Sequence, residues 1–299
     1  MPMTRLARTL ALLSAAVTAV PAQDAPAQRP TFRATADAVR LEVSVRVGTR
    51  VVTGLQARDF EVMDNGVAQE ITEVSYGVLP IDVTVVLDVS ASVTGQALSR
   101  LRSAIGELMG DLRKDDRLKL VLFNNRVTRI VDFTTDVAAV QRALRGASAA
   151  GGTSLYDAVS VALISAADPD RRQLVLVFTD GQDGNSATSA DTLVAVARRS
   201  NATLSIVMPV SAGLAGALQT MTAVTSMAAE TGGITLPLAP GGNMGTTFRS
   251  VLDEFRSTYV LLFTPRGVER NGDHTLQVRV HRERAIVRAK RGYVAGSGG

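Results

Sequence analysis

The sequence predicts an α/β fold in which a Rossmann-like, doubly wound and mostly parallel sheet is inserted in, or flanked by, a small all-β, sandwich-like domain. Residues 80–256 alternate apolar strand-like runs with amphipathic helix-like segments, which is the pattern of a parallel sheet covered on both faces. Residues 33–79 and 257–294 carry only strand-like patterns. Each flank is too small for a core of its own, so we expect the two to pair. Two separate small β modules are the alternative.

The first 22 residues have the pattern of an export signal. Arg5 and Arg8 precede an apolar run over residues 10–20, and small residues follow, with an expected cleavage site after Ala22. The run is shorter than the ~20 residues that span a bilayer. Residues 23–32 are rich in Pro, Ala and Gln and are expected to form a linker, and residues 295–299 a flexible tail. We therefore expect an exported protein, periplasmic or secreted, with no transmembrane helix in the mature chain.

Composition excludes several functional classes. The absence of cysteine excludes disulfides and thiolate metal sites. Aromatic residues make up 4% of the chain and tryptophan is absent, which disfavours base stacking. Removing the two arginines of the signal lowers the formal net charge from +4 to +2, so no nucleic-acid partner is expected.

The flanks contain strand patterns joined by turns. Residues 39–47 alternate apolar and polar side chains, which predicts a strand with one buried face. Residues 60–76 form two strand-like runs around a hairpin turn at residues 64–66. Strand patterns return at residues 257–265, 275–281 and 285–294. The C-terminal flank is basic and is expected to be a solvated strand face, on which His274 and His281 are exposed.

The central region alternates in order. A strand over residues 83–87 is a nearly continuous apolar run and is expected to be buried on both faces. Further strands are expected at residues 116–125, 172–181 and 202–210. Helices are expected at residues 95–112, 134–146, 154–167, 188–200, 214–233 and 245–255.

Oxygen-bearing side chains occur in three loops at one expected edge of this sheet. Asp88, Ser90 and Ser92 follow the first strand, Thr153 follows two glycines, and Asp180 ends the strand that begins at residue 172. Ligands of open α/β sheets bind at the carboxyl ends of the strands. Hydroxyl and carboxylate oxygens are hard ligands that suit Mg²⁺. The sequence therefore predicts a metal site at this edge.

The segments "DVSAS", "GGTSLYDA" and "FTDG", in this order, resemble the von Willebrand factor type A domain and its metal-ion-dependent adhesion site. All five metal-site positions of that family are matched. The resemblance implies that Ser90 and Ser92 bind Mg²⁺ directly and Thr153 directly or through water. Asp88 and Asp180 would act largely through water or by switching between direct and water-mediated contact. Mn²⁺ and Ca²⁺ are alternatives. The flanks resemble those of exported von Willebrand-A-related proteins of acidobacteria-like bacteria.

The expected function is non-enzymatic binding of a partner protein that presents an acidic group to the metal. An envelope protein whose metal only stabilises the fold is the alternative. A serine hydrolase with Ser90 or Ser92 as the nucleophile is disfavoured, because both histidines lie on the C-terminal flank and no Gly-x-Ser-x-Gly motif occurs. Asp183 is expected to be a turn residue. No catalytic or organic-cofactor residue is predicted.

Overall fold

The computed structural model describes residues 38–93, 95–165, 168, 170–209 and 217–296. The chain divides into two units, residues 1–31 and 32–299, and the described residues belong to the second. The predicted export signal, the linker and residues 297–299 of the tail lie outside the described residues. Within the described part, no helix is long and apolar enough to cross a membrane.

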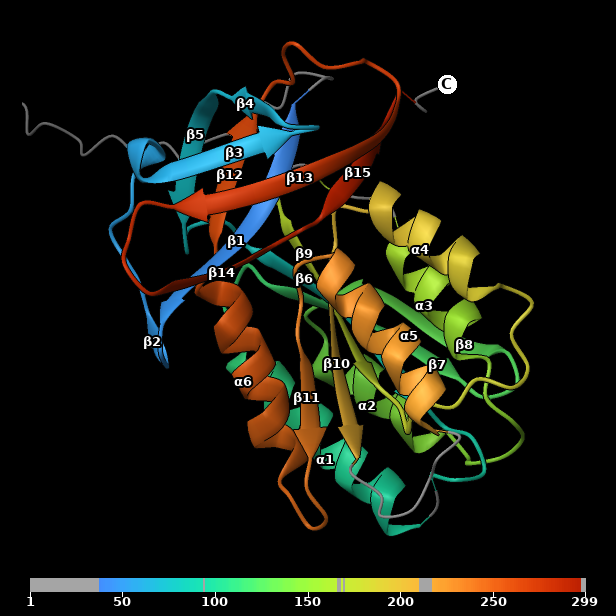
Figure 1. Cartoon of the computed structure of the whole chain (residues 1–299). Coiled ribbons are helices and arrows are strands. Elements are labelled where there is room, and N and C mark those ends of the chain that lie inside the picture. The colour runs from blue at the N-terminus through green and yellow to red at the C-terminus, as the bar shows by residue number, and fades with distance from the viewer. Residues whose placement is uncertain (1–37, 94, 166–167, 169, 210–216, 297–299) are drawn as a thin grey trace, which may run out of the picture. The chain divides into compact units, whose positions relative to one another are not determined.

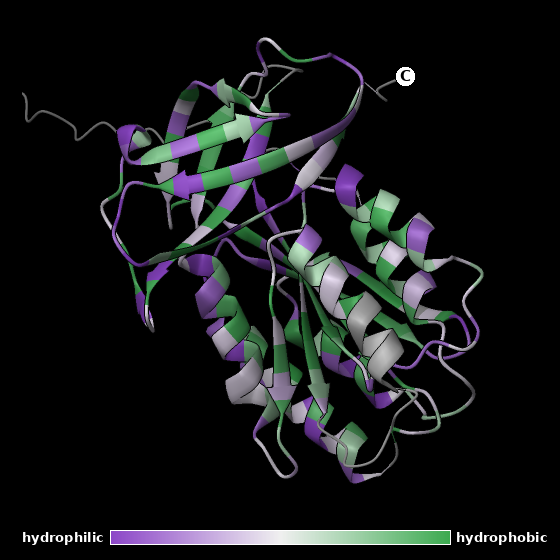
Figure 2. Cartoon of the chain, in the orientation of Figure 1, coloured by the Kyte–Doolittle hydropathy of each residue, from purple (hydrophilic) through white to green (hydrophobic). Residues whose placement is uncertain are grey.

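A six-stranded sheet lies at the centre of the α/β region, in the order β11-β10-β9-β6-β7-β8 (Figure 1). Five strands are parallel to their neighbours, and the eight residues of β6 are all buried, as predicted. Figure 2 shows hydrophobic residues along these central strands. The strands are β6 (Ile81–Asp88), β7 (Arg117–Phe123), β8 (Val127–Thr134), β9 (Arg172–Phe178), β10 (Thr203–Pro209) and β11 (Thr235–Leu238).

The sheet is mixed, because β8 runs antiparallel to β7. Neither β8 nor β11 was predicted, and both lie at edges of the sheet. An edge strand keeps solvent-facing positions such as Ile130, 48% exposed, and Asp132, which pairs with Lys119 at 3.4 Å. Polar residues such as Thr128 and Asp132 interrupt β8, so it lacks the continuous apolar run that identifies a central strand.

Helices cover both faces of the sheet, so the α/β region is doubly wound. On one face, buried side chains such as Leu101, Val140 and Phe248 form a single cluster with β6 and β7. On the other, Leu155, Leu193 and their neighbours form a second cluster. The first face carries α1 (Gln96–Asp111), α2 (Val137–Arg145) and α6 (Met244–Arg256), and the second carries α3 (Leu155–Ile164), α4 (Ala190–Arg199) and α5 (Ala217–Glu230).

The flanking strands form two further sheets that interleave the two ends of the chain. One has the order β14-β1-β12-β5 with β2 beside β1, and the other has the order β15-β13-β3-β4. Leu41, Phe60, Leu261 and Leu276, from both flanks, share one buried cluster. The elements are β1 (Val39–Val47), β2 (Arg50–Val51), a 3₁₀ turn (Ala57–Asp59), β3 (Phe60–Asp64), β4 (Val67–Gln69), β5 (Ile71–Tyr76), β12 (Tyr259–Phe263), β13 (Gly272–Val280), β14 (Ala285–Ala289) and β15 (Gly292–Ala295).

Strand β1 is buried on both faces, which corrects the prediction of one buried face. Glu42 and Ser44, on its polar face, are only 8% and 4% exposed. Arg172 of β9 pairs with Glu42 at 2.7 Å, and the Ser44 hydroxyl donates to Glu254 of α6 at 2.9 Å. The polar face of β1 therefore contacts the α/β region. The alternation of residues 39–47 separates apolar side chains, which pack in the core of the flanking sheets, from polar side chains, which bond to the α/β region.

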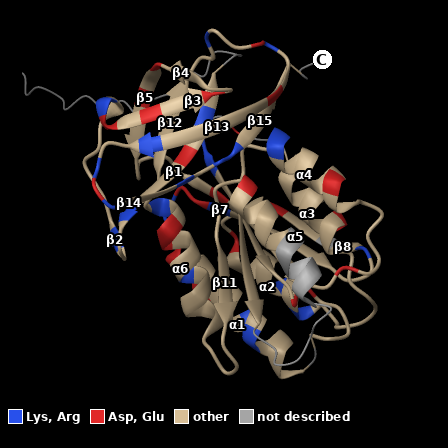
Figure 3. Cartoon of the chain, viewed as in Figure 1, with Lys and Arg blue, Asp and Glu red and all other residues tan. Residues whose placement is uncertain are grey.

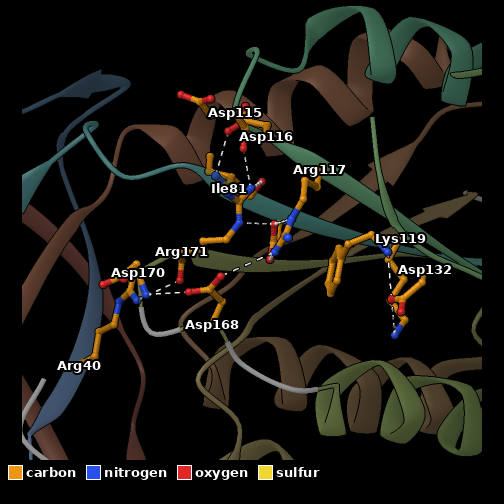
Figure 4. Close-up of polar contacts among 12 residues, drawn as sticks. Arg40, Ile81, Asp115, Asp116, Arg117, Lys119, Asp132, Asp168, Asp170 and Arg171 are labelled. Atoms are coloured by element: carbon orange, nitrogen blue, oxygen red, sulfur yellow. Dashed lines mark hydrogen bonds and ion pairs between the residues drawn. The ribbon is translucent and has the colours of Figure 1, made fainter. Parts of the chain in front are cut away.

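The amino ends of the central strands carry buried ion pairs (Figure 4). Asp82 of β6 is 2% exposed and accepts from Arg117 at 2.6 Å and from Arg171 at 2.6 Å. Asp116, before β7, accepts from Arg256 of α6 at 2.8 Å. Each buried carboxylate at this end has a guanidinium partner, as buried charges require.

Candidate functional site

The loop after β6 brings three of the predicted residues together. Asp88 is fully buried, and its Oδ1 accepts from the backbone N–H of Ser90 at 2.8 Å. Its Oδ2 accepts from the Thr179 hydroxyl at 3.3 Å. The hydroxyl oxygens of Ser90 and Ser92 lie 3.0 Å apart. The carboxylate of Asp88 is thus fixed by donors, while the two serine hydroxyls contact one another.

The loop that contains Thr153 runs beside the β6 loop. The Ala91 N–H donates to the carbonyl of Gly151 at 3.0 Å, and the Ala150 N–H donates to the carbonyl of Val89 at 3.1 Å. The Thr153 carbonyl accepts from the N–H groups of Gly184 and Asn185, at 3.0 and 3.1 Å, in the loop after β9. These backbone bonds hold all three loops together.

The two glycines before Thr153 are required by this close approach. Gly151 has φ +78°, in the left-handed region that disfavours a side chain. A Cβ at Gly152 would collide with the side chain of Asn185. The structure thus explains the "GGT" segment, because larger residues would push the Thr153 loop away from the loop after β9.

Asp180 follows β9 and is partly buried. Its Oδ1 accepts from the Gln182 N–H at 3.2 Å. Its neighbour Thr179 accepts from the Gly181 N–H at 3.1 Å while donating to Asp88, so this hydroxyl connects the ends of β6 and β9. Thr179 was not among the predicted site residues, although its place in "FTDG" at a strand end was the available signal.

The electrostatics of this edge are unbalanced. Burial raises the pKa of Asp88 above its usual range, hydrogen bonds from Ser90 oppose the shift, and the negative charge of Asp180 adds to it. Within the described part of the chain, neither Asp88 nor Asp180 forms an ion pair. Two carboxylates therefore lie at this edge without a protein cation.

The residues present fit a divalent cation. Neighbouring ligands of an octahedral Mg²⁺ with bonds of 2.0–2.1 Å lie about 2.8 to 3.0 Å apart, and the Ser90 and Ser92 hydroxyls have this separation. Among the described residues, no group of three or more His, Cys, Asp or Glu side chains could hold a metal. The five residues at this edge are not such a group, because three of them carry neutral hydroxyls and only two carry carboxylates.

Asp183 does more than form a turn. Its Oδ1 accepts from the Tyr156 N–H at 3.2 Å and from the Ser186 hydroxyl at 2.6 Å. Asp157 of α3 in turn accepts from the Thr188 N–H at 2.8 Å. These bonds fasten the loop after β9 to the first turn of α3, directly after Thr153.

The prediction for His274 was wrong. Its side chain is buried at 2% exposure, and its Nδ1 lies 2.7 Å from Oδ1 of Asp64. Tyr293 donates to the other Asp64 oxygen at 2.7 Å and stacks on the imidazole. Its partner Asp64 lies on β3, the strand that pairs with β13, but 210 positions away in the sequence, so a local pattern cannot reveal it. His281 is exposed, as predicted. Both histidines belong to the flanking strands rather than to the loops of the central sheet.

Residues 83–182 match the family model of the von Willebrand factor type A (VWA) domain. The matched region begins in β6, ends two residues after Asp180 and contains all five predicted metal-site residues. The chain therefore contains a VWA domain in this region.

Two curated relatives each match about a third of the chain. An uncharacterized protein of Synechocystis is 31% identical over 109 residues, which are 35% of this chain and 26% of that protein. The human inter-alpha-trypsin inhibitor heavy chain H4 is 26% identical over 116 residues, which are 34% of this chain and 12% of that protein. The chain thus spans about a quarter or less of these relatives.

A solved structure extends the likeness beyond the VWA domain. The von Willebrand factor type A protein from Catenulispora acidiphila superposes with a TM-score of 0.50 and 13% identity, and the match covers 86% of this chain and 73% of that one. At this identity the likeness concerns the fold alone. It supports the mixed α/β architecture.

Proposed function

We propose that the VWA domain holds one Mg²⁺ ion through Asp88, Ser90, Ser92, Thr153 and Asp180, and uses it to bind an acidic group of a partner protein. The observation that carries the proposal is the pair of carboxylates without a protein cation beside two hydroxyls 3.0 Å apart. Ser90, Ser92 and Thr153 are assigned to direct contact with the ion. Asp88, whose two oxygens already accept hydrogen bonds, is assigned to the outer shell with Asp180.

The donor set favours recognition over catalysis. Bound Mg²⁺ would supply an electron-poor coordination position, since three of the five residues are neutral. A carboxylate of a partner protein suits that position. The described loops around the site offer hydroxyls, carboxylates and amides but no imidazole to act as a general base.

We also propose that the protein is exported and that its α/β region is an insertion between two halves of one β domain. The pairing of β1 with β12 and of β3 with β13 supports the insertion. The pattern of residues 1–22 supports export. The second candidate function, an envelope protein whose metal only stabilises the fold, is favoured by the same carboxylate pair and differs in having no metal-dependent partner.

Calorimetry with Mg²⁺ on EDTA-treated protein tests the metal site. We expect one site in the wild type and none in Asp88→Ala or Ser90→Ala. Matched controls are Asp191→Ala and Ser99→Ala, which alter exposed residues of α4 and α1. Equal binding by all four variants would refute the assignment.

Affinity capture from envelope extract separates the two functions. We expect immobilised protein to retain a partner in Mg²⁺ and to release it in EDTA, with the circular dichroism spectrum unchanged. Capture that is indifferent to EDTA, combined with a lower melting temperature in EDTA, would favour the purely structural role.

A further inference from the structure

A cavity of about 700 Å³ lies away from the VWA metal loops, between the flanking strands and the end of α4. Its walls come from the start of β1, the last turn of α4, the loop after β12, and β15 with the residues before it. Figure 3 shows basic residues at the end of α4 that faces β15. The charged side chains that line it are Arg40, Arg198, Arg199, Glu269, Arg270 and Lys290.

Lys290 is the unusual member of this group. It was predicted to lie on a solvated strand face, yet it is only 8% exposed. Its Nζ donates to the carbonyl of Ser200 at 2.5 Å, at the end of α4 between the cavity-lining residues Arg199 and Asn201. Within the described residues, Lys290 forms no ion pair. Burial lowers its pKa to about 8, so the amine keeps its proton at neutral pH.

The other cations of the cavity divide into two groups. Arg198 is neutralised by Glu230 at 3.5 Å and by Asp273 at 3.7 Å. Arg40 lies 3.7 Å from Glu42. Arg199 and Arg270 are exposed and form no ion pair with any described residue. Among the described residues that line the cavity, Glu269 is the single acid, so this lining carries excess positive charge.

The end of α4 alone does not account for this charge. A helix C-terminus attracts cations, which explains arginines in the last turn of α4. Lys290 and Arg270, however, come from the flanking strands and from the loop after β12. A buried ammonium is costly unless it is paired, and one carbonyl satisfies only one of its three N–H groups. The volume is also typical of small-molecule sites.

We propose that this cavity binds a small phosphorylated molecule, with Lys290 at its base and Arg199 and Arg270 at its opening. Guanidinium groups bind phosphate oxygens in pairs, and the lysine supplies a point charge. Asn201 and Asn271 also line the cavity and can bind hydroxyl groups of the same ligand. The site is independent of the VWA metal loops, so either can exist without the other.

Calorimetric titration of the full chain with glycerol 3-phosphate, in EDTA and at constant ionic strength, tests the site. We expect Lys290→Met and Arg270→Gln each to weaken binding at least tenfold. Arg282→Gln, which alters an exposed arginine outside the cavity lining, is the matched control and is expected to bind as the wild type does. Because Arg270 is exposed, its variant tests the site even if Lys290→Met fails to fold.

Two further arms identify the source of the phosphate. Inorganic phosphate tests the bare group, and co-sedimentation with phosphatidylglycerol vesicles tests a lipid headgroup. Loss of vesicle binding in Lys290→Met and Arg270→Gln assigns a headgroup, whereas loss confined to the soluble ligands assigns a free metabolite. No binding in any arm, or equal weakening by Arg282→Gln, overturns the proposal.

Discussion

Strand β6 carries a buried aspartate at each end, and the two have opposite surroundings. Asp82, at the amino end, is 2% exposed and is held by Arg117 and Arg171. Asp88, at the carboxyl end, is fully buried and accepts hydrogen bonds from Ser90 and Thr179 only, among the described residues. The charged group that affects the pKa of Asp88 is another carboxylate, that of Asp180.

The comparison distinguishes a buried charge that the protein neutralises itself from one that a bound cation could neutralise. At the amino end, arginine side chains neutralise the buried carboxylates beside β6, β7 and β9. At the carboxyl end the protein supplies dipoles, which stabilise a carboxylate without neutralising it. One end should thus depend on its arginines and the other on divalent cations.

The largest effect is expected from breaking the amino end. Arg172, 1% exposed, begins β9 and bonds to Glu42 and to the carbonyl of Phe255. Arg172→Met leaves the buried Glu42 carboxylate with only the more distant Arg40, at 3.7 Å, and the Thr258 hydroxyl, which should lower the free energy of unfolding by about 3 kcal/mol. Urea denaturation measures this loss, with Arg100→Met on the exposed face of α1 as the control. If Mg²⁺ restored the stability of Arg172→Met, the amino end would depend on divalent cations, which would contradict the distinction between the two ends of the sheet.

The next effect concerns the carboxyl end. In EDTA, Asp88→Asn should unfold at a denaturant concentration no lower than the wild type, because the substitution removes a buried charge that has no counter-charge. With Mg²⁺ at a hundred times its dissociation constant, the wild type should gain about 2.7 kcal/mol and the variant nothing. Denaturant midpoints in EDTA and in Mg²⁺ provide both numbers. A marked loss of stability of Asp88→Asn in EDTA would show that the hydrogen bonds to Asp88 are enough to offset the cost of burying its charge.

A smaller effect is expected at Thr153. Thr153→Ala removes one neutral oxygen and leaves Asp88, Ser90, Ser92 and Asp180 in place, while the Thr153 carbonyl keeps its bonds to the loop after β9. We expect Mg²⁺ affinity to fall about tenfold, or about 1.4 kcal/mol, with the melting temperature in EDTA unchanged. Thr153→Ser, which keeps the hydroxyl, should recover most of the affinity. Failure of that recovery would assign the effect to packing of the methyl group.

The smallest effect concerns Lys290, which like Asp88 is a buried charge without a counter-charge among the described residues. Its pKa is about 8 in the fold and 10.5 when unfolded, so the unfolded chain binds more protons between these values and stability rises with pH there. The cost of burying the charged Lys290 amine is fully present below about pH 8 and disappears as the pH approaches 10.5. We expect a gain of about 1 kcal/mol between pH 7 and pH 9, absent in Lys290→Met. The charged side chains that line the same cavity as Lys290 are Arg40, Arg198, Arg199, Arg270 and Glu269.

Equal pH slopes in the wild type and in Lys290→Met would contradict this account of Lys290. Urea denaturation of both proteins at pH 7, 8 and 9 supplies the comparison. Because other groups titrate equally in the two proteins, the difference between the slopes isolates the lysine.

The two ends of the sheet also differ in what could be predicted from the sequence. The carboxyl end is encoded in short segments, since Asp88, Ser90 and Ser92 are spaced two apart and the glycines directly precede Thr153. The amino end is encoded in pairs far apart: Arg171 and Asp82 are separated by 89 positions and Arg172 and Glu42 by 130. A local pattern shows the first kind of site and misses the second.

The same limit explains the remaining errors. His274 and Asp64 are 210 positions apart, so the pattern around residue 274 could not show its buried partner. Lys290 was taken for a solvated residue because the contact that buries it, the carbonyl of Ser200, lies 90 positions earlier. The polar face of β1 was assigned to solvent for the same reason, whereas the central strands, whose burial is written in continuous apolar runs, were predicted correctly.

The register of the flanking sheet has a consequence for how the chain folds. Tyr76, the last residue of β5, lies directly opposite Tyr259, the first residue of β12, so the long segment between them leaves and rejoins the sheet at adjacent positions. Closing a long loop costs entropy that grows only slowly with its length, by about 0.6 kcal/mol per doubling. The cost falls further once the segment between has folded and brought its own ends together. We therefore expect the VWA region to fold first and the flanking strands to pair last. During synthesis, β1 can pair with β14 only after residues 285–289 have left the ribosome.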